Sequence, residues 1–333
     1  MRIWKILLAV AAVLGFGVSN LYAQDINAVD EKGRTKLMYA ARDSQNPQEI
    51  EDLIKQGADV NARDNKGWTT LMVASLFNQN PEITEILIKN GADINARQED
   101  GATALMVASS NNPNSEIIKT LIKHGADIKA RDKKGRTALA HASSSNQNPE
   151  IIETLIKYGA DIRDRDNFGA TILSNASSNN PNSEIIGTLI RYGVDVNARS
   201  KDGSTDLMGA SGLNSNPKII DTLIKNGADV NARGKMGLSA LIFASSSNQN
   251  PEIIETLIKN GADIEARTEG GLTALMLASM NNENPKVIEA LLDAGANVRA
   301  RNEDGKTALD YAKENPKIYQ TDVYWRMNDM MYQ

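Results

Sequence analysis

Cysteine is missing from the 333-residue chain. Its absence excludes disulfide bonds, thiolate catalysis, cysteine-ligated zinc and lipid attachment through cysteine. Only two histidines are present, and they fall at different positions of the repeat described below, so they form neither a catalytic dyad nor a metal-binding pair. No glycine-rich phosphate-binding loop with a lysine is found. We therefore expect no metal, no cofactor and no enzymatic activity.

Aromatic residues are scarce, at 5% of the chain. Large aromatic side chains commonly anchor one big hydrophobic core, so their scarcity favours many small and similar cores. Blocks of like charge are also lacking, and the net charge is −5. Because binding to nucleic acid requires a concentrated positive surface, we expect no nucleic-acid partner.

The first 23 residues have the pattern of a secretory signal peptide. Residues 1–5 carry two positive charges, residues 6–18 form an apolar run, and Ala23 is the small residue expected at a cleavage site. The run is shorter than the roughly 20 residues that span a bilayer. We expect cleavage after Ala23, a periplasmic or secreted location, and no membrane association afterwards. An uncleaved membrane anchor is the alternative.

Glycine and proline recur with a period of 34 residues from Asp25 to the C-terminal tail, and all nine prolines fall in one region of the repeat, within three residues of the same place. The first glycine series comprises Gly33, Gly67, Gly101, Gly135, Gly169, Gly203, Gly237, Gly271 and Gly305. The second series comprises Gly57, Gly91, Gly125, Gly159, Gly193, Gly227, Gly261 and Gly295. A repeat of this length is typical of a solenoid and leaves no room for another domain.

Each unit contains the signals of two short helices. Thr or Ser two residues after a first-series glycine is a natural N-cap, and Leu and Ala three residues apart then share one helix face. Asn-Pro-Glu starts the second helix, which a second-series glycine ends in the left-handed conformation. One helix pair cannot bury its own apolar stripe, so neighbouring pairs must stack. We predict an all-α solenoid of helix-turn-helix pairs linked by β-turns or hairpins.

The segments Gly-x-Thr-x-Leu-x-x-Ala, Glu-Ile-Ile-x-x-Leu-Ile and Gly-Ala-Asp-Val-Asn-Ala resemble the ankyrin repeat family. The resemblance runs from Asp25 to about Asn315 and, with the leader, suggests a bacterial exported member. It implies nine repeats over residues 24–316 and a C-terminal capping segment over 317–333. The family's usual Thr-Pro-Leu-His is replaced by Thr-Ala-Leu-Met or similar, and the loop between the helices has one extra residue.

The tail from Lys306 begins as a ninth unit and then departs from the pattern. It contains five aromatic residues, Tyr311, Tyr319, Tyr324, Trp325 and Tyr332. Terminal repeats are usually atypical because one of their faces meets water. We expect an amphipathic capping helix over residues 317–331, with an aromatic docking site as the alternative. At the other end, the first helix pair is expected to serve as the N-terminal cap.

The family resemblance implies that a partner binds along a concave face formed by turn tips and first helices. Carried over to this sequence, the candidate partner-binding residues are Arg63, Lys66, Trp68, Leu76, Phe77, Phe168, Leu213, Met236, Leu238, Leu272 and Met280. Most of these residues are apolar, although a surface that only has to keep the protein soluble would carry polar residues at these positions. Aromatic residues, in addition, are frequent energetic anchors of protein interfaces. We predict two apolar contact regions, an N-terminal patch (Trp68 and Phe77) and a C-terminal patch (Met236, Leu238 and Leu272). Packing of single side chains against neighbouring turns is the alternative.

An arginine also recurs every 34 residues, in a ladder that comprises Arg63, Arg97, Arg131, Arg165, Arg199, Arg233, Arg267 and Arg301. The ladder either binds an acidic partner or is a solvent-exposed row whose charge is balanced by nearby carboxylates such as Asp59 and Asp93. Exposed ion pairs contribute only about 0–1 kcal/mol each. We favour the solvated row.

These observations predict a monomeric protein-binding module in the periplasm or outside the cell, with another protein as its partner. Two alternatives remain. One is a secreted effector directed at a host. The other is a binder of glycan or cell wall, in which Trp68 and Phe168 stack on sugars.

Overall fold

The computed structural model describes residues 25–333. The expected signal peptide, residues 1–23, lies outside the described residues. Within the described range the chain forms α-helices at the predicted spacing, with a few isolated β-bridges between them. The helices are α2 (Lys36–Asp43), α3 (Pro47–Lys55), α4 (Thr70–Phe77), α5 (Pro81–Lys89), α6 (Ala104–Asn111), α7 (Ser115–Lys123), α8 (Ala138–Ser145), α9 (Pro149–Lys157), α10 (Ile172–Asn179), α11 (Ser183–Arg191), α12 (Asp206–Leu213), α13 (Pro217–Lys225), α14 (Ala240–Ser247), α15 (Pro251–Lys259), α16 (Ala274–Asn281), α17 (Pro285–Asp293), α18 (Ala308–Glu314) and α19 (Asp322–Tyr332). The prediction of an all-α solenoid is confirmed.

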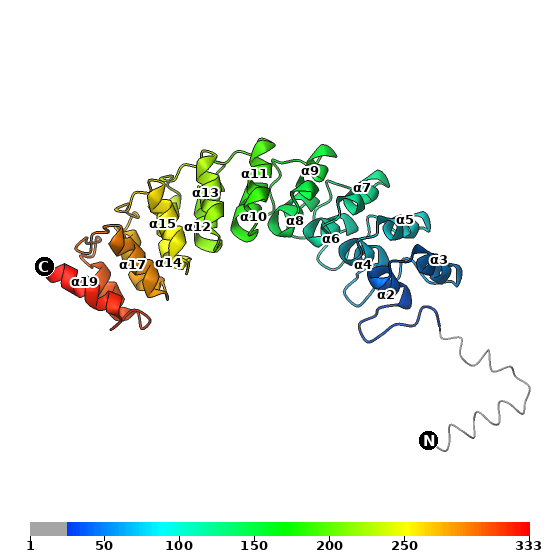
Figure 1. Cartoon of the computed structure of the whole chain (residues 1–333), viewed down its shortest axis with the longest axis horizontal. Coiled ribbons are helices and arrows are strands. Elements are labelled where there is room, and N and C mark those ends of the chain that lie inside the picture. The colour runs from blue at the N-terminus through cyan, green and yellow to red at the C-terminus, as the bar shows by residue number, and fades with distance from the viewer. Residues whose placement is uncertain (1–24) are drawn as a thin grey trace, which may run out of the picture.

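The helix pairs stack side by side into an arc (Figure 1). Each even-numbered first helix contacts the next first helix, and each odd-numbered second helix contacts the next second helix. The labelled first helices α4 to α14 line the inner, concave edge, and the second helices α5 to α15 form the outer edge. The concave face therefore consists of first helices and of the loops that precede them.

The helix boundaries follow from capping, as the second unit illustrates. The Thr69 hydroxyl accepts a hydrogen bond from the N–H of Met72 (3.3 Å) at the start of α4. The Asn80 side chain accepts one from the N–H of Glu82 (3.0 Å) at the start of α5, where proline occupies the first turn. Gly91 ends α5 with a φ of 88°, a left-handed conformation that disfavours other residues. The capping residues of each unit therefore determine where both helices of a pair begin and end.

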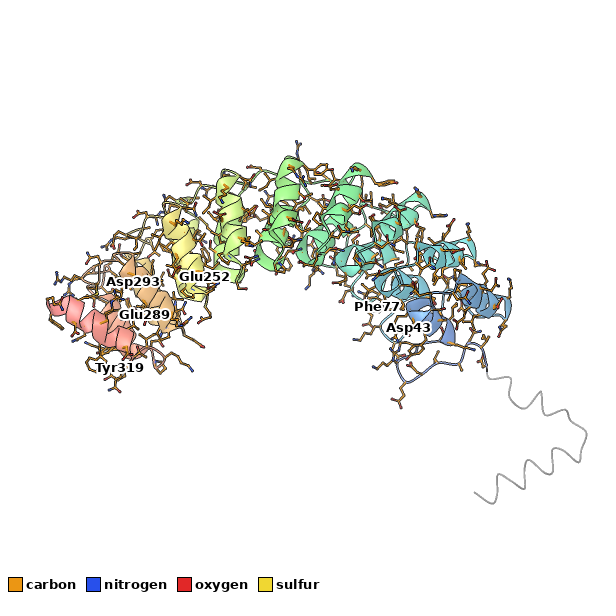
Figure 2. All side chains as sticks on the ribbon, viewed as in Figure 1. Asp43, Phe77, Glu252, Glu289, Asp293 and Tyr319 are labelled. Carbon is orange, nitrogen blue, oxygen red and sulfur yellow. The ribbon has the colours of Figure 1, made fainter. Side chains whose placement is uncertain are left out.

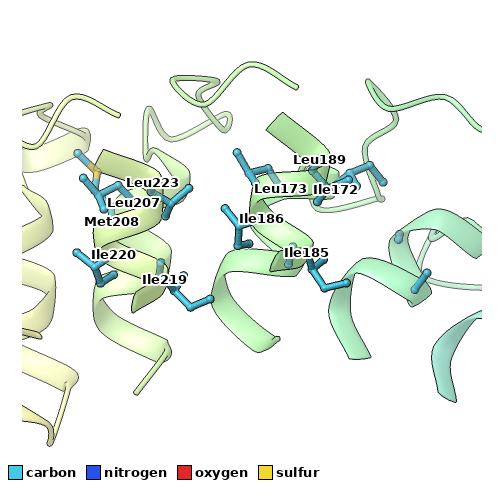
Figure 3. Packing of buried hydrophobic residues seen from close by; sticks show 14 of the residues in the cluster. Ile172, Leu173, Ile185, Ile186, Leu189, Leu207, Met208, Ile219, Ile220 and Leu223 are labelled. Atoms are coloured by element: carbon cyan, nitrogen blue, oxygen red, sulfur yellow. The ribbon is translucent and has the colours of Figure 1, made fainter. Parts of the chain in front are cut away.

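The core runs continuously along the solenoid, as expected for stacked repeats. Figure 3 shows its middle, where Ile185 and Ile186 of α11 belong to a row of buried side chains that continues into the neighbouring units. Leu173 of α10 and Leu207 of α12 complete this layer, and all four side chains are essentially inaccessible to solvent. Burial of one such side chain contributes about 1.5–3 kcal/mol.

A buried column of asparagines ties each helix pair to the one before it. Asn112, which caps the C-terminus of α6, donates to the carbonyls of Ser75 (2.9 Å) and Asn78 (2.8 Å) in the preceding unit. Its side-chain oxygen accepts from the N–H of Asn114 (2.9 Å). The same bonds recur at Asn78, Asn146, Asn180, Asn214, Asn248, Asn282 and Asn315. The asparagine-rich loop is therefore part of the stacking interface.

In the described part of the chain, a hairpin loop precedes each of the nine first helices, and eight of these hairpins connect successive pairs. In each loop the N–H three residues before the first-series glycine bonds the carbonyl one residue after it. We number them hairpins 1 to 9, and they comprise residues 27–35, 61–69, 95–103, 129–137, 163–171, 197–205, 231–239, 265–273 and 299–307. They confirm the predicted hairpin links.

The C-terminal end of the arc is closed by α19, which packs on α17 and α18. This helix begins at Asp322, five residues after the expected start of the cap, and it buries Val323, Tyr324 and Met327. Trp325 and Tyr332 remain exposed. Because α19 follows α18 as its second helix, the expected domain boundary after residue 316 falls inside the ninth pair.

Candidate binding surface

The hairpin turns determine where the candidate residues of the second unit lie. The Asp64 carboxylate accepts hydrogen bonds from the N–H groups of Lys66 (2.8 Å) and Trp68 (2.9 Å). Gly67 lies between them with a φ of 76°. An aspartate turn of this kind is rigid, so hairpin 2 holds Lys66 and Trp68 in fixed positions beside the first helices.

The N-terminal patch borders a pocket of about 290 Å³. Its lining comes from two units, with Arg34, Met38, Tyr39 and Arg42 from the first and Asp64, Lys66, Trp68, Val73 and Phe77 from the second. The Phe77 side chain is 58% exposed and lies toward the N-terminal end of the arc (Figure 2). The structure thus brings together three predicted residues, Lys66, Trp68 and Phe77.

Tyr39 forms the centre of a polar cluster at this pocket. Its hydroxyl donates to Asp30 (2.6 Å), and the guanidinium groups of Arg34 and Arg42 lie 4.9 and 5.2 Å from its ring centroid. Arg34 pairs with Asp30 (3.0 Å) and Arg42 with Asp43 (2.7 Å). The hydrogen bond from Tyr39 is the main reason that the pKa of Asp30 lies well below its ordinary value. The pocket is therefore lined by aromatic side chains and by arginine side chains that pair with nearby carboxylates.

Tyr39 and Arg34 were not among the predicted binding residues. The tip and helix-end positions that the family resemblance implies do not include the middle of the first helix, where Tyr39 lies. A signal was available, because this position changes from unit to unit while the position after it is alanine in all nine units. It holds Tyr39, Val73, Val107, His141, Asn175, Gly209, Phe243, Leu277 and Tyr311.

The C-terminal patch spans hairpins 7 and 8. The N–H of Glu269 donates to the carbonyl of Met236 (2.9 Å), which places the two turns side by side. Leu238 and Leu272 are half-buried against the core, whereas Met236 is 57% exposed. The patch therefore offers one protruding side chain on an apolar base.

Met236 has an unusual backbone conformation, with a φ of 60°. In other hairpins a polar side chain three residues before the first-series glycine caps the turn, as Asp64 does in hairpin 2. Gly234 takes that place in hairpin 7, and the turn tightens into a short 3₁₀ segment, Lys235–Gly237. A left-handed non-glycine residue is strained, and such strain tends to lie at functional positions.

The remaining predicted residues are scattered. Phe168, at the tip of hairpin 5, is 75% exposed, and Leu213, at the end of α12, is 72% exposed. Leu76 and Met280 are half-buried against the core. Phe168 lies on hairpin 5, between the two patches along the chain and part of neither, so the structure does not bring all predicted residues into one site.

The arginine ladder binds the backbone. Arg233 donates through Nη1 to the carbonyl of Gly237 in its own hairpin (2.7 Å) and to that of Arg267 in the next one (3.0 Å). Arg63 makes the equivalent bonds to Gly67 (3.3 Å) and Arg97 (2.8 Å). The ladder arginines are exposed, as expected for a solvated row, but the predicted balance by carboxylates is wrong, because within residues 25–333 only Arg131 of the ladder forms an ion pair, with Asp164. The ladder is a structural element that joins successive hairpins.

His141 also has a structural environment. Its Nε2 lies 3.0 Å from Asp132, which in turn pairs with Arg136 (2.8 Å). Burial is the main reason that the pKa of His141 is lowered. Tyr39 and Asp30 form the same contact in the first unit, so the pair braces a hairpin against its helix. Among the described residues no group of three potential ligands could hold a metal ion, and no helix is long and apolar enough to cross a membrane.

Comparison with known families agrees with this architecture. A family model described as ankyrin repeats (3 copies) matches residues 7–98, 77–166, 145–234, 173–268 and 241–321. No curated protein matches the chain. The overlapping matches cover far more than half of the sequence, and the helix pairs and hairpins recur at the same period. The chain belongs to the ankyrin repeat family.

Proposed function

We propose that this protein holds another protein against its concave face, in the periplasm or outside the cell, and that it catalyses no reaction. Its ankyrin repeats make it a protein–protein interaction module. The observation that carries the choice of face is the pocket between the first two units, lined by Tyr39, Trp68 and Phe77. Aromatic side chains in a partly enclosed pocket are the usual energetic anchors of protein interfaces.

The distribution of apolar side chains along the arc supports two contact regions. The N-terminal patch lies on unit 2, beside the pocket that units 1 and 2 form, and the C-terminal patch lies on units 7 and 8. Between them the first helices carry polar groups such as His141 of α8 and Asn175 of α10, and the exposed apolar Phe168 and Leu213 belong to neither patch. A partner that contacts both patches must therefore extend along the arc, and its central part must be compatible with a polar surface.

The proposed location rests on the N-terminal segment and on composition. A basic start, an apolar run and a small residue at position 23 fit an exported protein. The lack of cysteine is compatible with an oxidising compartment, because no thiol is available for mispairing. A secreted effector would use the same surface, and its presence in culture supernatant would distinguish it from a periplasmic protein.

A capture experiment tests the proposed face. The exported wild-type protein is cross-linked and its partner identified by mass spectrometry. Capture is then compared with a variant that carries Trp68→Ser, Phe77→Ser, Met236→Ser and Leu238→Ser. We expect capture of that partner to fall at least tenfold, because removal of one anchor commonly costs 2 kcal/mol or more.

Tyr158→Ser is the control, because it removes an exposed aromatic residue at the end of α9, in the second-helix layer and outside both patches. It should retain most of the capture. Undiminished capture by the fourfold variant, with an intact circular dichroism spectrum, would contradict the proposed face. Retention on isolated cell-wall material in the absence of protein would favour the glycan alternative.

A further inference from the structure

Neighbouring hairpins are normally joined by three kinds of hydrogen bond. In the first, an asparagine bridges two units, as Asn61 does by donating to the carbonyl of Gly91 (2.9 Å) and accepting from the N–H of Asp93 (2.8 Å). The second is the arginine ladder. The third is a tip bond, such as that from the N–H of Glu99 to the carbonyl of Lys66 (3.2 Å). Together they hold the hairpin side of the solenoid closed.

The junction between hairpins 5 and 6 lacks all three. Position 163 holds arginine in place of asparagine, and this side chain makes no bond to hairpin 6. Arg165 bonds only the carbonyl of Gly169 in its own hairpin (2.8 Å). The N–H of Lys201 makes no bond to the carbonyl of Phe168. Along residues 25–333, each of the other seven junctions retains at least two of the three kinds.

At the tips, the backbones of hairpins 5 and 6 are farther apart than those of hairpins 3 and 4, and their spacing resembles that of hairpins 6 and 7, where a Cβ on Gly203 would meet the next backbone at 3.8 Å. A Cβ placed on Gly169 would meet only the aliphatic part of Lys201, at 3.6 Å. A Cβ on the equivalent Gly101 of hairpin 3 would meet the backbone N of Lys133 in the next hairpin at 3.1 Å. The junction is therefore open at its tips even though the helices behind it remain stacked.

An acidic side chain is buried at the same junction. Asp206, the first residue of α12, is 4% exposed. Five other units have alanine at this place, namely Ala104, Ala138, Ala240, Ala274 and Ala308. The only hydrogen-bond partner of the carboxyl within the described residues is the Thr171 hydroxyl, 3.2 Å from both of its oxygens. This hydroxyl already accepts a hydrogen bond from the N–H of Ser174 (2.8 Å) at the start of α10.

The charges around Asp206 do not compensate for its burial. The pKa of Asp206 is raised to about 7, chiefly by burial; the Thr171 hydroxyl and Arg165 oppose this rise, and the neighbouring Asp195 adds to it. The first helices on either side, α10 and α14, contain no charged residue. The charged residues of α13 are Lys218, Asp221 and Lys225 on the outer helix layer, and two of them pair with each other.

We propose that the junction between hairpins 5 and 6 is a hinge, which protonation of Asp206 keeps closed and ionisation of Asp206 opens. The ionised carboxylate gains water when the two hairpins separate, and few bonds oppose that separation. The buried asparagine column crosses this junction intact, since Asn214 donates to the carbonyls of Ser177 (2.9 Å) and Asn180 (3.0 Å). The hairpins therefore separate about the asparagine column as a pivot.

Because the hinge lies between the two patches, its opening changes the shape of the arc. The N-terminal patch lies on one side of the junction, and the C-terminal patch lies on the other. Opening between hairpins 5 and 6 changes the distance between the patches while leaving each patch intact. The hinge thus links the pH of the compartment to the geometry of the concave face.

Hydrogen exchange measured by mass spectrometry on the intact protein tests the hinge. Peptides covering residues 199–206 are compared with the equivalent peptides 233–240 of the next junction, at pH 6 and pH 8.5, after correction for intrinsic exchange rates. If Asp206 has an ordinary pKa in the open form, the opening equilibrium at hairpin 6 rises about tenfold across this range. The control peptides should change far less.

Two variants separate the carboxyl from the missing bonds. Asp206→Ala installs the residue found in five other units and should abolish the pH dependence of peptides 199–206. Arg163→Asn offers the asparagine bridge of the other junctions and should reduce opening at both pH values while keeping the pH dependence. If Asp206→Ala lowers the helical content, Asp206→Asn takes its place, because it removes the charge and keeps a polar partner for Thr171.

Two results would overturn the hinge. One is the same change in protection, between pH 6 and pH 8.5, in peptides 199–206 and 233–240 of the wild-type protein. The other is an unaltered pH dependence in the folded variant without the carboxyl at position 206.

Discussion

The hydroxyl of Tyr39 donates a 2.6 Å hydrogen bond to the carboxylate of Asp30, and this bond connects α2 to the turn of hairpin 1. The bond stabilises the ionised carboxylate and is the largest cause of the lowered pKa of Asp30. We predict that Tyr39→Phe raises the pKa of Asp30 toward its ordinary value of 3.8. An NMR titration of the Asp30 carboxyl would measure the shift.

Tyr311→Phe is the control for this change. It alters the equivalent position of the ninth unit, where the partner of the hydroxyl is the amide of Asn302 and no carboxylate is bonded. The titration of Asp30 should therefore be the same as in the wild-type protein. A Tyr39→Phe variant with an unchanged Asp30 titration would show that the backbone hydrogen bonds from Lys32 and Arg34 suffice.

The buried asparagine column predicts a large effect at a residue that looks like part of a polar loop. Asn112→Ala leaves the carbonyls of Ser75 and Asn78 and the N–H of Asn114 without partners. Each unsatisfied buried group costs about 1–3 kcal/mol. We expect the free energy of unfolding, measured with urea, to fall by about 3 kcal/mol.

Asn111→Ala tests the same chemistry one residue earlier. Asn111 is exposed, and its side chain bonds only the neighbouring Ser110 hydroxyl. Exposed substitutions of this kind usually change stability by less than about 0.5 kcal/mol. Equal losses of unfolding free energy in the two variants would mean that the hydrogen bonds of Asn112 add nothing to stability beyond the effect of an asparagine-to-alanine change at a helix end.

The sequence predicted the fold because its information is local and repeated. Capping residues such as Thr69 and Asn80, together with Gly91, determine the helix ends within a single unit. That the units stack can be predicted from the apolar stripe, which one helix pair cannot bury by itself. Asn112, by contrast, bonds atoms 34 and 37 residues away, and no pattern within one unit shows that its side chain points into the preceding pair.

The candidate surface was predicted only in part, for the same reason. Trp68 and Phe77 were identified because they are apolar at tip and helix-end positions. Tyr39 belongs to the other unit that lines the pocket, and only the stacking geometry brings it there. The hydrogen bonds of the arginine ladder were not predicted because the acceptors are backbone carbonyls, which the sequence does not reveal.

Strain at Met236 predicts opposite effects on stability and on binding. Met236→Gly relieves a left-handed conformation at a φ of 60°, which costs a non-glycine residue about 1–2 kcal/mol. Part of this gain is offset by the greater freedom of glycine in the unfolded chain. We expect thermal or urea unfolding to show stabilisation by about 0.5–1 kcal/mol, together with weaker partner capture. Lys66→Gly, at the same place of hairpin 2 but without a positive φ, should destabilise the protein.

Asp206 predicts an unusual pH dependence of global stability. Its pKa is raised on folding from 3.8 to about 7, so between these values the folded state binds more protons than the unfolded state. Stability from this group is therefore greatest below about pH 4, falls as the pH rises to about 7, and then stays constant. Since one pKa unit corresponds to about 1.4 kcal/mol, Asp206→Ala should raise the free energy of unfolding at pH 8 by up to about 4 kcal/mol more than at pH 4. Urea titrations of both proteins at the two pH values would measure this difference, and equal effects of the substitution at both would show that the carboxyl titrates normally in the folded protein.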